Sequence, residues 1–233
     1  MTQVSTRRHA EPGLIDASPC TQRLSACCIP CTGPESRLAE LLGLACDPSD
    51  CRRVQDQLRR LGRTHAVLSR CNRSLARAPS ERALLDAFCS NLIEVGDYGF
   101  AWIGYAERRS GRIRPAAHAG TADGGLGAAV FAAANSAACR SASRVACEDG
   151  EPVVLRDLAD RTQLAPWADA ALTHGLRSMI ALPLHAESGA IGNFSIFATT
   201  PDAFGAPEVS LLAELAADLA FGIQALRARA AQA

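Results

Sequence analysis

The sequence predicts an α+β fold. We expect a central antiparallel sheet with helices on one face, a pocket covered by helices and loops on the other, and a long helix at each end. Apolar residues repeat with heptad spacing near both ends of the chain, and a mean spacing of about 3.5 residues forms one seam on a helix. Between these helices, apolar segments joined by short turns form hairpins. Further helical segments separate the hairpins, which is typical of an α+β domain.

The composition predicts a globular core without a charge bias. The chain has 233 residues, of which 48% are hydrophobic, and 24 basic residues balance 24 acidic ones. Nucleic-acid binding usually leaves a basic stripe, so we expect no nucleic-acid partner. We interpret the cluster of Arg52, Arg53, Arg59, Arg60 and Arg63 as a solvated helix face. No apolar run approaches the roughly 20 residues that span a bilayer, and the N-terminus lacks the apolar core of a signal peptide. We therefore expect a cytoplasmic protein without a membrane segment.

Residues 1–51 differ from the rest in being rich in proline and cysteine. They hold six of the ten cysteines: Cys20, Cys27, Cys28, Cys31, Cys46 and Cys51. We expect a disordered tail with one short helix around Arg37–Leu44. The alternative is a metal-binding or redox-responsive site, because four thiolates can bind zinc or an iron–sulfur cluster. The cysteine spacing fits no standard zinc finger.

The two heptad helices are expected at residues 52–79 and 206–233. The first seam consists of Val54, Leu58, Leu61, His65, Leu68, Asn72 and Leu75. The second consists of Val209, Leu212, Ala216, Leu219, Ile223, Leu226 and Ala230. We expect a partner helix to bury each seam, which predicts a homodimer held by the terminal helices.

Residues 80–205 form the predicted globular domain. Ser80 caps a helix over Glu81–Glu94, whose apolar residues form one stripe. A later helix over 164–175 ends at Gly175 in the left-handed conformation. Residues 121–150 should hold short helices and a mobile loop. Strands are expected at residues 98–107, 113–120, 151–158, 177–186 and 190–200, with the first two and the last two forming hairpins.

Three ring-bearing residues are candidates for the pocket. Aromatic residues make up only 5% of the chain, so their positions are informative. Trp102 lies in the middle of a strand, where it is either core or pocket lining. Trp167 begins a helix that faces the expected pocket, and its indole N–H needs a partner if it is buried. His118 ends the second strand, where it is either a hydrogen-bonded structural residue or a ligand to a metal or haem.

Asp157 and Arg177 complete the predicted ligand-binding set. Asp157 follows a short strand, where it either binds a ligand donor or caps backbone N–H groups. Arg177 opens a strand and either clamps an anionic ligand or forms a salt bridge with Asp157 or Asp169. We expect no catalytic residue and no metal ligand in this set.

Three stretches resemble the GAF domains of bacterial sensor histidine kinases and of diguanylate cyclase or phosphodiesterase proteins. They are LRRLGRTHAVLSRCNRSLARAPSERALLDAFCSNLIEVGDYGFAWIGYAERRSGRIRPAAHAG, GEPVVLRDLADRTQLAPWADAALTHGLRSMIALPL and AIGNFSIFATTPDAFGAPEVSLLAELAADLAFGI. The resemblance covers about residues 54–230. It implies a non-catalytic sensory module that binds a small ligand or a protein partner and transmits its state through dimeric terminal helices.

The sequence departs from the family pattern in two ways. The stretch SAACRSASRVACEDGEPVV has serine and arginine where the family usually has a glycine-rich turn, so one wall of the pocket should differ. No kinase or cyclase segment follows the last helix, so we expect a kinase or a cyclic-di-nucleotide output protein to act in trans. The identity of the ligand stays open.

An enzymatic alternative follows from the same resemblance. One GAF-fold family reduces free methionine-R-sulfoxide with a nucleophilic and a resolving cysteine beside the pocket. Here only Cys139 and Cys147 are available for these roles, because residues 148–233 contain no cysteine. We therefore expect that the chain is not an enzyme.

Overall fold

The computed structural model describes residues 48–107, 110, 112–120, 125–134, 142–160, 167–186 and 189–232. The chain divides into two compact units, Met1–Gln57 and Leu58–Ala233, and the second holds the sheet and its covering helices. The expected helix around Arg37–Leu44 and five of the six N-terminal cysteines lie outside the described residues. Cys51 belongs to the first described helix, but its side chain is also outside the description.

Five antiparallel strands form one sheet in the order β2-β1-β5-β4-β3. The strands are β1 (Phe100–Ala106), β2 (Ile113–Gly120), β3 (Val153–Leu155), β4 (Ser178–Ala186) and β5 (Gly189–Ala198). β1 pairs with β2 and β4 pairs with β5, so both predicted hairpins are confirmed. β3 is short and pairs only with Met179–Ala181 of β4.

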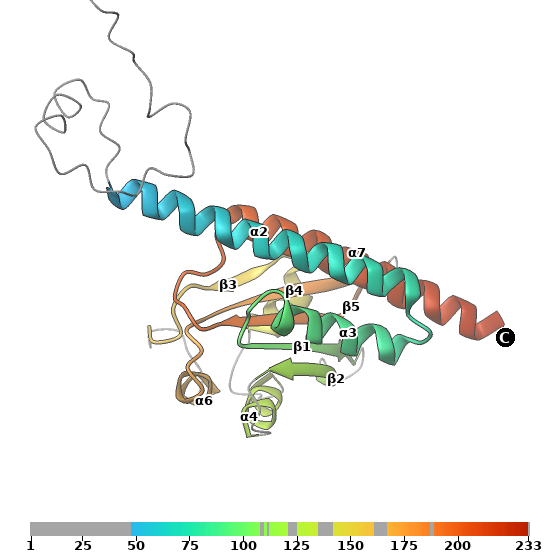
Figure 1. The fold of residues 1–233 in the computed structure, drawn as a ribbon. Coiled ribbons are helices and arrows are strands. Elements are labelled where there is room, and N and C mark those ends of the chain that lie inside the picture. Colours follow the sequence, from blue (N-terminus) through green and yellow to red (C-terminus); the bar gives the residue numbers. More distant parts are fainter. Residues whose placement is uncertain are drawn as a thin grey trace, which may run out of the picture. The chain divides into compact units, whose positions relative to one another are not determined.

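Helices cover both faces of this sheet, as the sequence predicted (Figure 1). One face carries α3 (Glu81–Glu94), α7 (Ala206–Gln232) and, from Leu58 onward, α2 (Pro48–Arg77). The other face carries α4 (Gly125–Ala134), α5 (Ala142–Asp149) and α6 (Trp167–Thr173). The side chain of Ser80 accepts a hydrogen bond from the Ala83 N–H, and Gly175 has φ of 75°, so both predicted helix ends are confirmed.

Alternate residues of β1 enter two separate cores. Ala101 and Ile103 pack with α2, α3 and α7, whereas Phe100 and Trp102 pack with the helices on the opposite face. All four side chains are at most 1% exposed. A strand that is buried on both faces needs apolar residues at successive positions, which explains the continuous run FAWI in the sequence.

The seam of α7 is buried inside its own domain rather than by a partner helix. Leu212, Ala216, Leu219 and Ile223 are at most 1% exposed and belong to the core beneath α7, where the helix packs on β4 and α3. A sheet face and a second helix of the same domain therefore cover the middle of this seam, and the expected homodimer stays a prediction.

α7 is also the helix of the described part that is long and apolar enough to cross a membrane, judged by length and composition alone. Within its most apolar window, 39% of the helix is buried in the protein. One such helix is weak evidence for a membrane span, because the core helix of a globular domain passes the same test.

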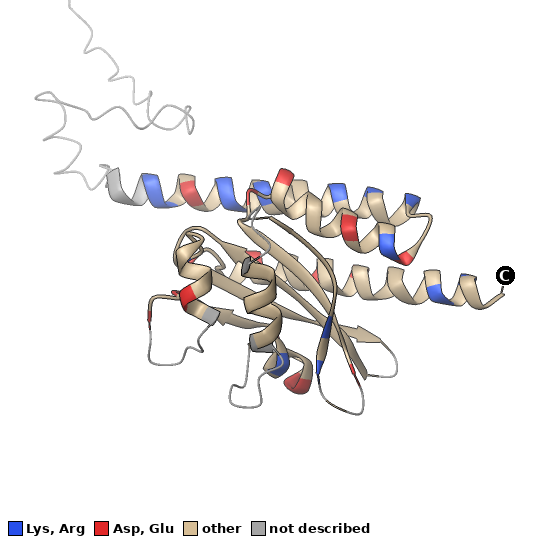
Figure 2. Ribbon diagram, turned by 90° about the horizontal axis from the view of Figure 1, so that it is seen from below, with Lys and Arg blue, Asp and Glu red and all other residues tan. Residues whose placement is uncertain are grey.

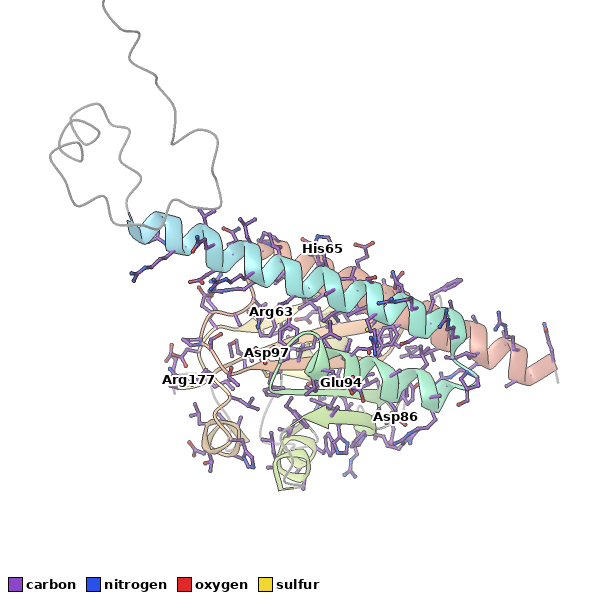
Figure 3. The ribbon with its side chains drawn as sticks, viewed as in Figure 1. Arg63, His65, Asp86, Glu94, Asp97 and Arg177 are labelled. Carbon is purple, nitrogen blue, oxygen red and sulfur yellow. The ribbon has the colours of Figure 1, made fainter. Side chains whose placement is uncertain are left out.

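α2 places its predicted seam beside the face that packs on the domain. The residues buried in the domain are Thr64, Val67 and Cys71, each with 0% exposure. The seam residue Leu58 is 63% exposed, and His65 points away from the domain on the outer side of α2 (Figure 3). At about 100° per residue, the seam and the buried face lie roughly a quarter turn apart on the helix.

Polar contacts anchor α2 to the domain from Leu58 onward. Arg60 Nη1 donates to the carbonyl oxygen of Asp202 at 2.9 Å, and Arg63 forms an ion pair with Asp97 at 3.5 Å (Figure 3). Basic residues recur along the whole of α2, while most of the sheet is uncharged (Figure 2). Two of the five arginines that we expected on a solvated face therefore hold the helix in place.

Candidate ligand-binding site

Trp102 and His118 meet on the face of the sheet that α4 covers. They are paired residues of β1 and β2, so their side chains point to the same face. The Phe131 ring of α4 lies edge-on to both, with centroid distances of 5.1 Å to Trp102 and 5.6 Å to His118. Trp102 is fully buried, whereas His118 lies on the edge strand and is exposed.

Gly104 makes room for the Trp102 indole. A Cβ atom at Gly104 would lie 2.6 Å from Trp102 Cζ3 and 2.5 Å from a methyl carbon of Ile113. Both neighbours are fully buried side chains, so neither can move aside easily in a close-packed interior. The glycine therefore fixes where the indole lies on the sheet.

α5 contributes a polar contact beside the tryptophan. Ser143 Oγ of α5 lies 3.0 Å from Ser195 Oγ of β5, and Asn193 Nδ2 donates to the same Ser195 oxygen at 2.7 Å. Ser195 is the direct cross-strand partner of Trp102 in the sheet. All three polar side chains are at most 4% exposed. This buried polar cluster of Ser143, Asn193 and Ser195 was not predicted.

Two buried atoms at this place have no hydrogen-bond partner in the described part of the structure. They are Trp102 Nε1 and Asn193 Oδ1. An unpaired polar group in a protein interior is unfavourable by about 1–3 kcal/mol, and such groups usually mark a position that water or a ligand completes. The pair therefore identifies a candidate binding site on this face of the sheet.

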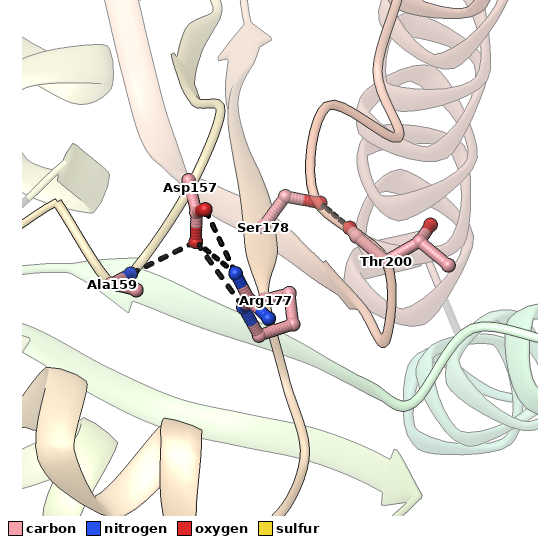
Figure 4. Close-up of polar contacts among 5 residues, drawn as sticks. All are labelled: Asp157, Ala159, Arg177, Ser178 and Thr200. Carbon is pink, nitrogen blue, oxygen red and sulfur yellow. Dashed lines mark hydrogen bonds and ion pairs between the residues drawn. The ribbon is translucent and has the colours of Figure 1, made fainter.

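Asp157 and Arg177 form an ion pair at the start of β4 (Figure 4). Arg177 Nη2 lies 2.9 Å from Asp157 Oδ2, and Nε lies 3.2 Å from Oδ1. Asp157 Oδ1 also accepts a hydrogen bond from the Ala159 N–H at 3.0 Å. The hydrogen bonds from Arg177 keep the pKa of the Asp157 carboxyl below its ordinary value. These contacts match the structural role that we considered for each residue, and a ligand-binding role for them stays a prediction.

Cys147 faces β5 from α5, one turn beyond Ser143. Its Sγ donates to the carbonyl oxygen of Gly192 at 3.1 Å. Burial, with a smaller contribution from Glu148, raises the pKa of this thiol to about 12. A reactive cysteine needs a lowered pKa, because the thiolate is the nucleophile. Cys147 therefore has the properties of a structural thiol.

A second polar cluster joins the sheet to the end of α7. Tyr105 Oη, at the end of β1, donates to Glu81 Oε1 of α3 at 2.5 Å. Arg227 of α7 binds both oxygens of the same carboxylate, at 2.7 Å and 2.9 Å, and its guanidinium lies 4.8 Å from the Tyr105 ring centroid. The hydrogen bond from Arg227, more than that from Tyr105, lowers the pKa of Glu81. We call these three residues the Glu81 cluster.

A groove of about 490 Å³ lies on the α7 side of the sheet. Its lining comes from residues 150–152, from Pro183 and His185 of β4, and from the α7 residues Ala213, Ala216, Ala217, Phe221 and Gln224. None of the residues predicted to bind a ligand lines this groove. It is therefore separate from the Trp102 site.

Two predicted residues lie beyond what the structure describes. Trp167 is the first residue of α6, but its side chain is outside the described part, and so is Cys139. Among the described residues, no group of three or more His, Cys, Asp or Glu side chains could hold a metal ion. The hypothesis of a metal site in the N-terminal tail falls on residues outside this description.

The comparison with protein families decides what kind of domain this is. The family model of the GAF domain matches residues 78–224. This chain belongs to the GAF domain family. The match extends from the cap of α3 through most of α7, so it includes the whole sheet and the Trp102 site. No curated protein matches the chain.

Solved structures show the same fold at low sequence identity. A free methionine-R-sulfoxide reductase from Neisseria meningitidis, in complex with its substrate, is 20% identical with a TM-score of 0.57, covering 71% of this chain and 91% of its own. The GAF domain of an Acinetobacter phosphoenolpyruvate-protein phosphotransferase is 14% identical with a TM-score of 0.54, covering 72% and 96%. A domain of a sensor histidine kinase protein described as putative, from Sinorhizobium meliloti 1021, is 20% identical with a TM-score of 0.50, covering 64% and 94%. These relatives include sensory and enzymatic proteins.

Proposed function

We propose that this GAF domain is a non-catalytic sensory module that binds a small molecule at the Trp102 site and signals through its terminal helices. The observation that carries the proposal is that β1 contributes a residue to the Trp102 site and a residue to the Glu81 cluster. Trp102 lies at the unpaired polar atoms on one face of the sheet, and Tyr105, three residues later, bonds to the Glu81 cluster on the other.

The Glu81 cluster is suited to pass a change in β1 to α7. Arg227 lies in the last third of α7 and contacts both Tyr105 and Glu81. A ligand that moves β1 would alter these contacts and shift the population of α7 conformations, to the extent that it binds the two conformations with different affinity. We propose a kinase or a cyclic-di-nucleotide output protein, acting in trans in the cytoplasm, as the receiver.

We also propose that the module is a homodimer held by α2. Leu58 is 63% exposed and Leu61 is half-buried in the protomer, whereas Leu68 and Leu75 already pack against the domain's own core. Heptad seams are normally covered by a second helix along their length. A second copy of the chain offers an identical seam. The α7 seam does not take part, since it is buried in the core of its own domain.

A thermal-shift screen with small metabolites tests the binding proposal. A ligand at a concentration 100 times its Kd should stabilise the native protein by about 2.7 kcal/mol, and it should change hydrogen exchange in the last turns of α7. Arg227→Gln should keep the stabilisation by the ligand and lose the exchange response. Arg82→Gln is the matched control, because Arg82 bonds to Asp86 of α3 and to the Ala116 carbonyl of β2 rather than to the Glu81 cluster.

Each outcome of this screen has a clear reading. If no metabolite raises the melting temperature, the sensory proposal is wrong. If a metabolite binds but α7 exchanges hydrogen identically in the free and bound protein, the transmission path through β1 is wrong. A response that Arg82→Gln abolishes as completely as Arg227→Gln would contradict a specific role for the Glu81 cluster.

The alternative function is reduction of free methionine-R-sulfoxide. The similarity in fold to the Neisseria meningitidis reductase favours testing it. The hydrogen-bonded, high-pKa thiol of Cys147 argues against it. The purified protein, supplied with a thiol reductant, should not turn over methionine-R-sulfoxide. Turnover that disappears in Cys147→Ser would replace the sensory proposal with the enzymatic one.

A further inference from the structure

We infer that the ligand of the Trp102 site is an uncharged molecule with an amide-like group, whose acceptor binds Trp102 Nε1 and whose donor binds Asn193 Oδ1. This inference rests on the proposed sensory function and specifies the chemistry of the molecule that is sensed. It follows from three properties of the site: the positions of the two unpaired atoms, the bonds that their polar neighbours make with one another, and the apolar surroundings.

The sheet register places the two side chains next to each other on one face. Trp102 pairs directly with Ser195, and Asn193 lies two residues before Ser195 on β5. Such diagonal neighbours on one face of an antiparallel pair are about 7–8 Å apart between backbone positions, which is within the reach of an indole and an amide. Both side chains have 0% exposure. The two unpaired atoms therefore belong to neighbouring side chains on one face of the sheet.

The neighbouring polar groups already bind one another. Asn193 Nδ2 donates to Ser195 Oγ, Ser195 Oγ lies within hydrogen-bond distance of Ser143 Oγ, and Cys147 Sγ donates to the Gly192 carbonyl. The two atoms without any partner are one donor and one acceptor, because an indole N–H only donates and an amide oxygen only accepts. A carboxamide presents the complementary pair, a carbonyl oxygen and an N–H group.

The surroundings disfavour a charged ligand. Trp102 lies in a core of apolar side chains from the sheet and from α4, α5 and α6. An ion without a counter-charge is strongly disfavoured in such a medium. A carboxylate would also place a second acceptor against Asn193 Oδ1. The site should therefore bind the amide form of a compound more tightly than its carboxylate form.

Indole resonances of the ¹⁵N-labelled protein report on the Trp102 site directly. The chain has two tryptophans, and the signal that Trp102→Phe removes belongs to Trp102. The probes are benzamide, nicotinamide and acetamide, each compared with benzoate, nicotinate or acetate. We expect at least one amide to move the Trp102 N–H resonance downfield and to raise the melting temperature. Its carboxylate should bind at least tenfold more weakly.

Asn193→Leu tests the acceptor, and Asn91→Leu is its matched control. Asn91 is also a buried asparagine, but it bonds to Ser74 and Cys71 between α3 and α2. We expect Asn193→Leu to weaken amide binding at least tenfold and Asn91→Leu to leave it unchanged. If Asn193→Leu does not fold, Trp102→Phe supplies the same test through the melting temperature.

Failure of this inference can be distinguished from failure of the sensory proposal. If carboxylates bind as tightly as amides, only the amide assignment is wrong and sensing at the Trp102 site stands. If metabolites stabilise the protein but the Trp102 resonance does not move, the ligand binds elsewhere, and both the amide assignment and the place of binding are wrong. The assignment is equally wrong if none of the three amides moves the resonance. If no metabolite or probe stabilises the protein at all, the sensory proposal fails as well.

Discussion

At the scale of single residues, the Trp102 site depends on a missing side chain as well as on the side chains that form it. Gly104 has no side chain, and the Trp102 ring occupies that space. The indole is thereby held with its N–H in the buried interior, where no described residue accepts it. A position that is optimised for stability would pair this group, so its retention is consistent with a binding role.

Gly104→Ala tests this arrangement. The added methyl group would clash with Trp102 and Ile113, and overpacking of a core typically destabilises by about 1–3 kcal/mol. We expect a loss of this size in the free energy of unfolding in urea, together with a change in the Trp102 indole resonance. Gly62→Ala is the control, because nothing lies within 4 Å of that added carbon and alanine favours a helix by roughly 0.5–1 kcal/mol. Equal effects of both changes would contradict the packing role of Gly104.

Sequence reasoning identified some residues of the candidate site and missed others, and each outcome has a physical reason. Trp102 stood out because aromatic residues are rare, and Asp157 and Arg177 because charged residues flank strands. Asn193 and Ser195 were missed, although they alternate as polar residues inside an otherwise apolar strand, which is a detectable signal of a polar cluster on one face. Ser143 could not be assigned, because a serine in a short, alanine-rich segment has no periodicity that reveals its neighbour.

At the scale of elements, the terminal helices differ in what their apolar spacing means. The α7 stripe was identified at the correct positions, but hydrophobic periodicity cannot tell whether a sheet or another helix buries it. The buried face of α2 was missed, because Thr64 and Cys71 contribute little to an apolar pattern. Packing and polar contacts with Tyr98 and Asn91 select that face.

The Glu81 cluster should make stability depend on pH. The pKa of Glu81 lies below its ordinary value of 4.5 in the folded protein, so its charged form stabilises the fold. This stability is fully present above pH 4.5 and is lost as the pH falls through the lower, folded value. Urea unfolding should show that Glu81→Gln destabilises by about 1 kcal/mol at neutral pH, as expected for a partly exposed ion pair.

The difference between wild type and Glu81→Gln should shrink as the solution is acidified below pH 4.5. Glu94→Gln, at the exposed far end of the same helix, controls for the loss of one carboxylate. A difference that stays constant down to the acid transition would show that the Glu81 carboxylate is not stabilised in the folded protein.

At the scale of the whole molecule, the fold was predicted more completely than the assembly. Hairpins and helix caps follow from local patterns, whereas dimer formation depends on a surface that one chain cannot bury by itself. The exposed α2 seam gives this proposal its test. Leu58→Glu combined with Leu61→Glu should weaken self-association by about 2 kcal/mol or more, measured by sedimentation equilibrium.

Ala66→Glu is the control for that double change. Ala66 is exposed and lies on the third face of α2, away from both the seam and the buried residues. The control should sediment as wild type does. A wild-type chain that sediments as a protomer at high concentration would remove the dimer from the proposal and leave the fold and the Trp102 site unaffected.

The brevity of β3 has a consequence for solubility. The pairing of β3 with β4 ends at Ala181, and the rest of β4 forms an edge of the sheet. Pro183 stands on that edge and lacks the N–H that an incoming strand would need, and the register shifts between Leu184 and His185. Such features blunt a sheet edge against amyloid-like stacking, so we expect this edge of β4 to resist pairing with a strand of another molecule.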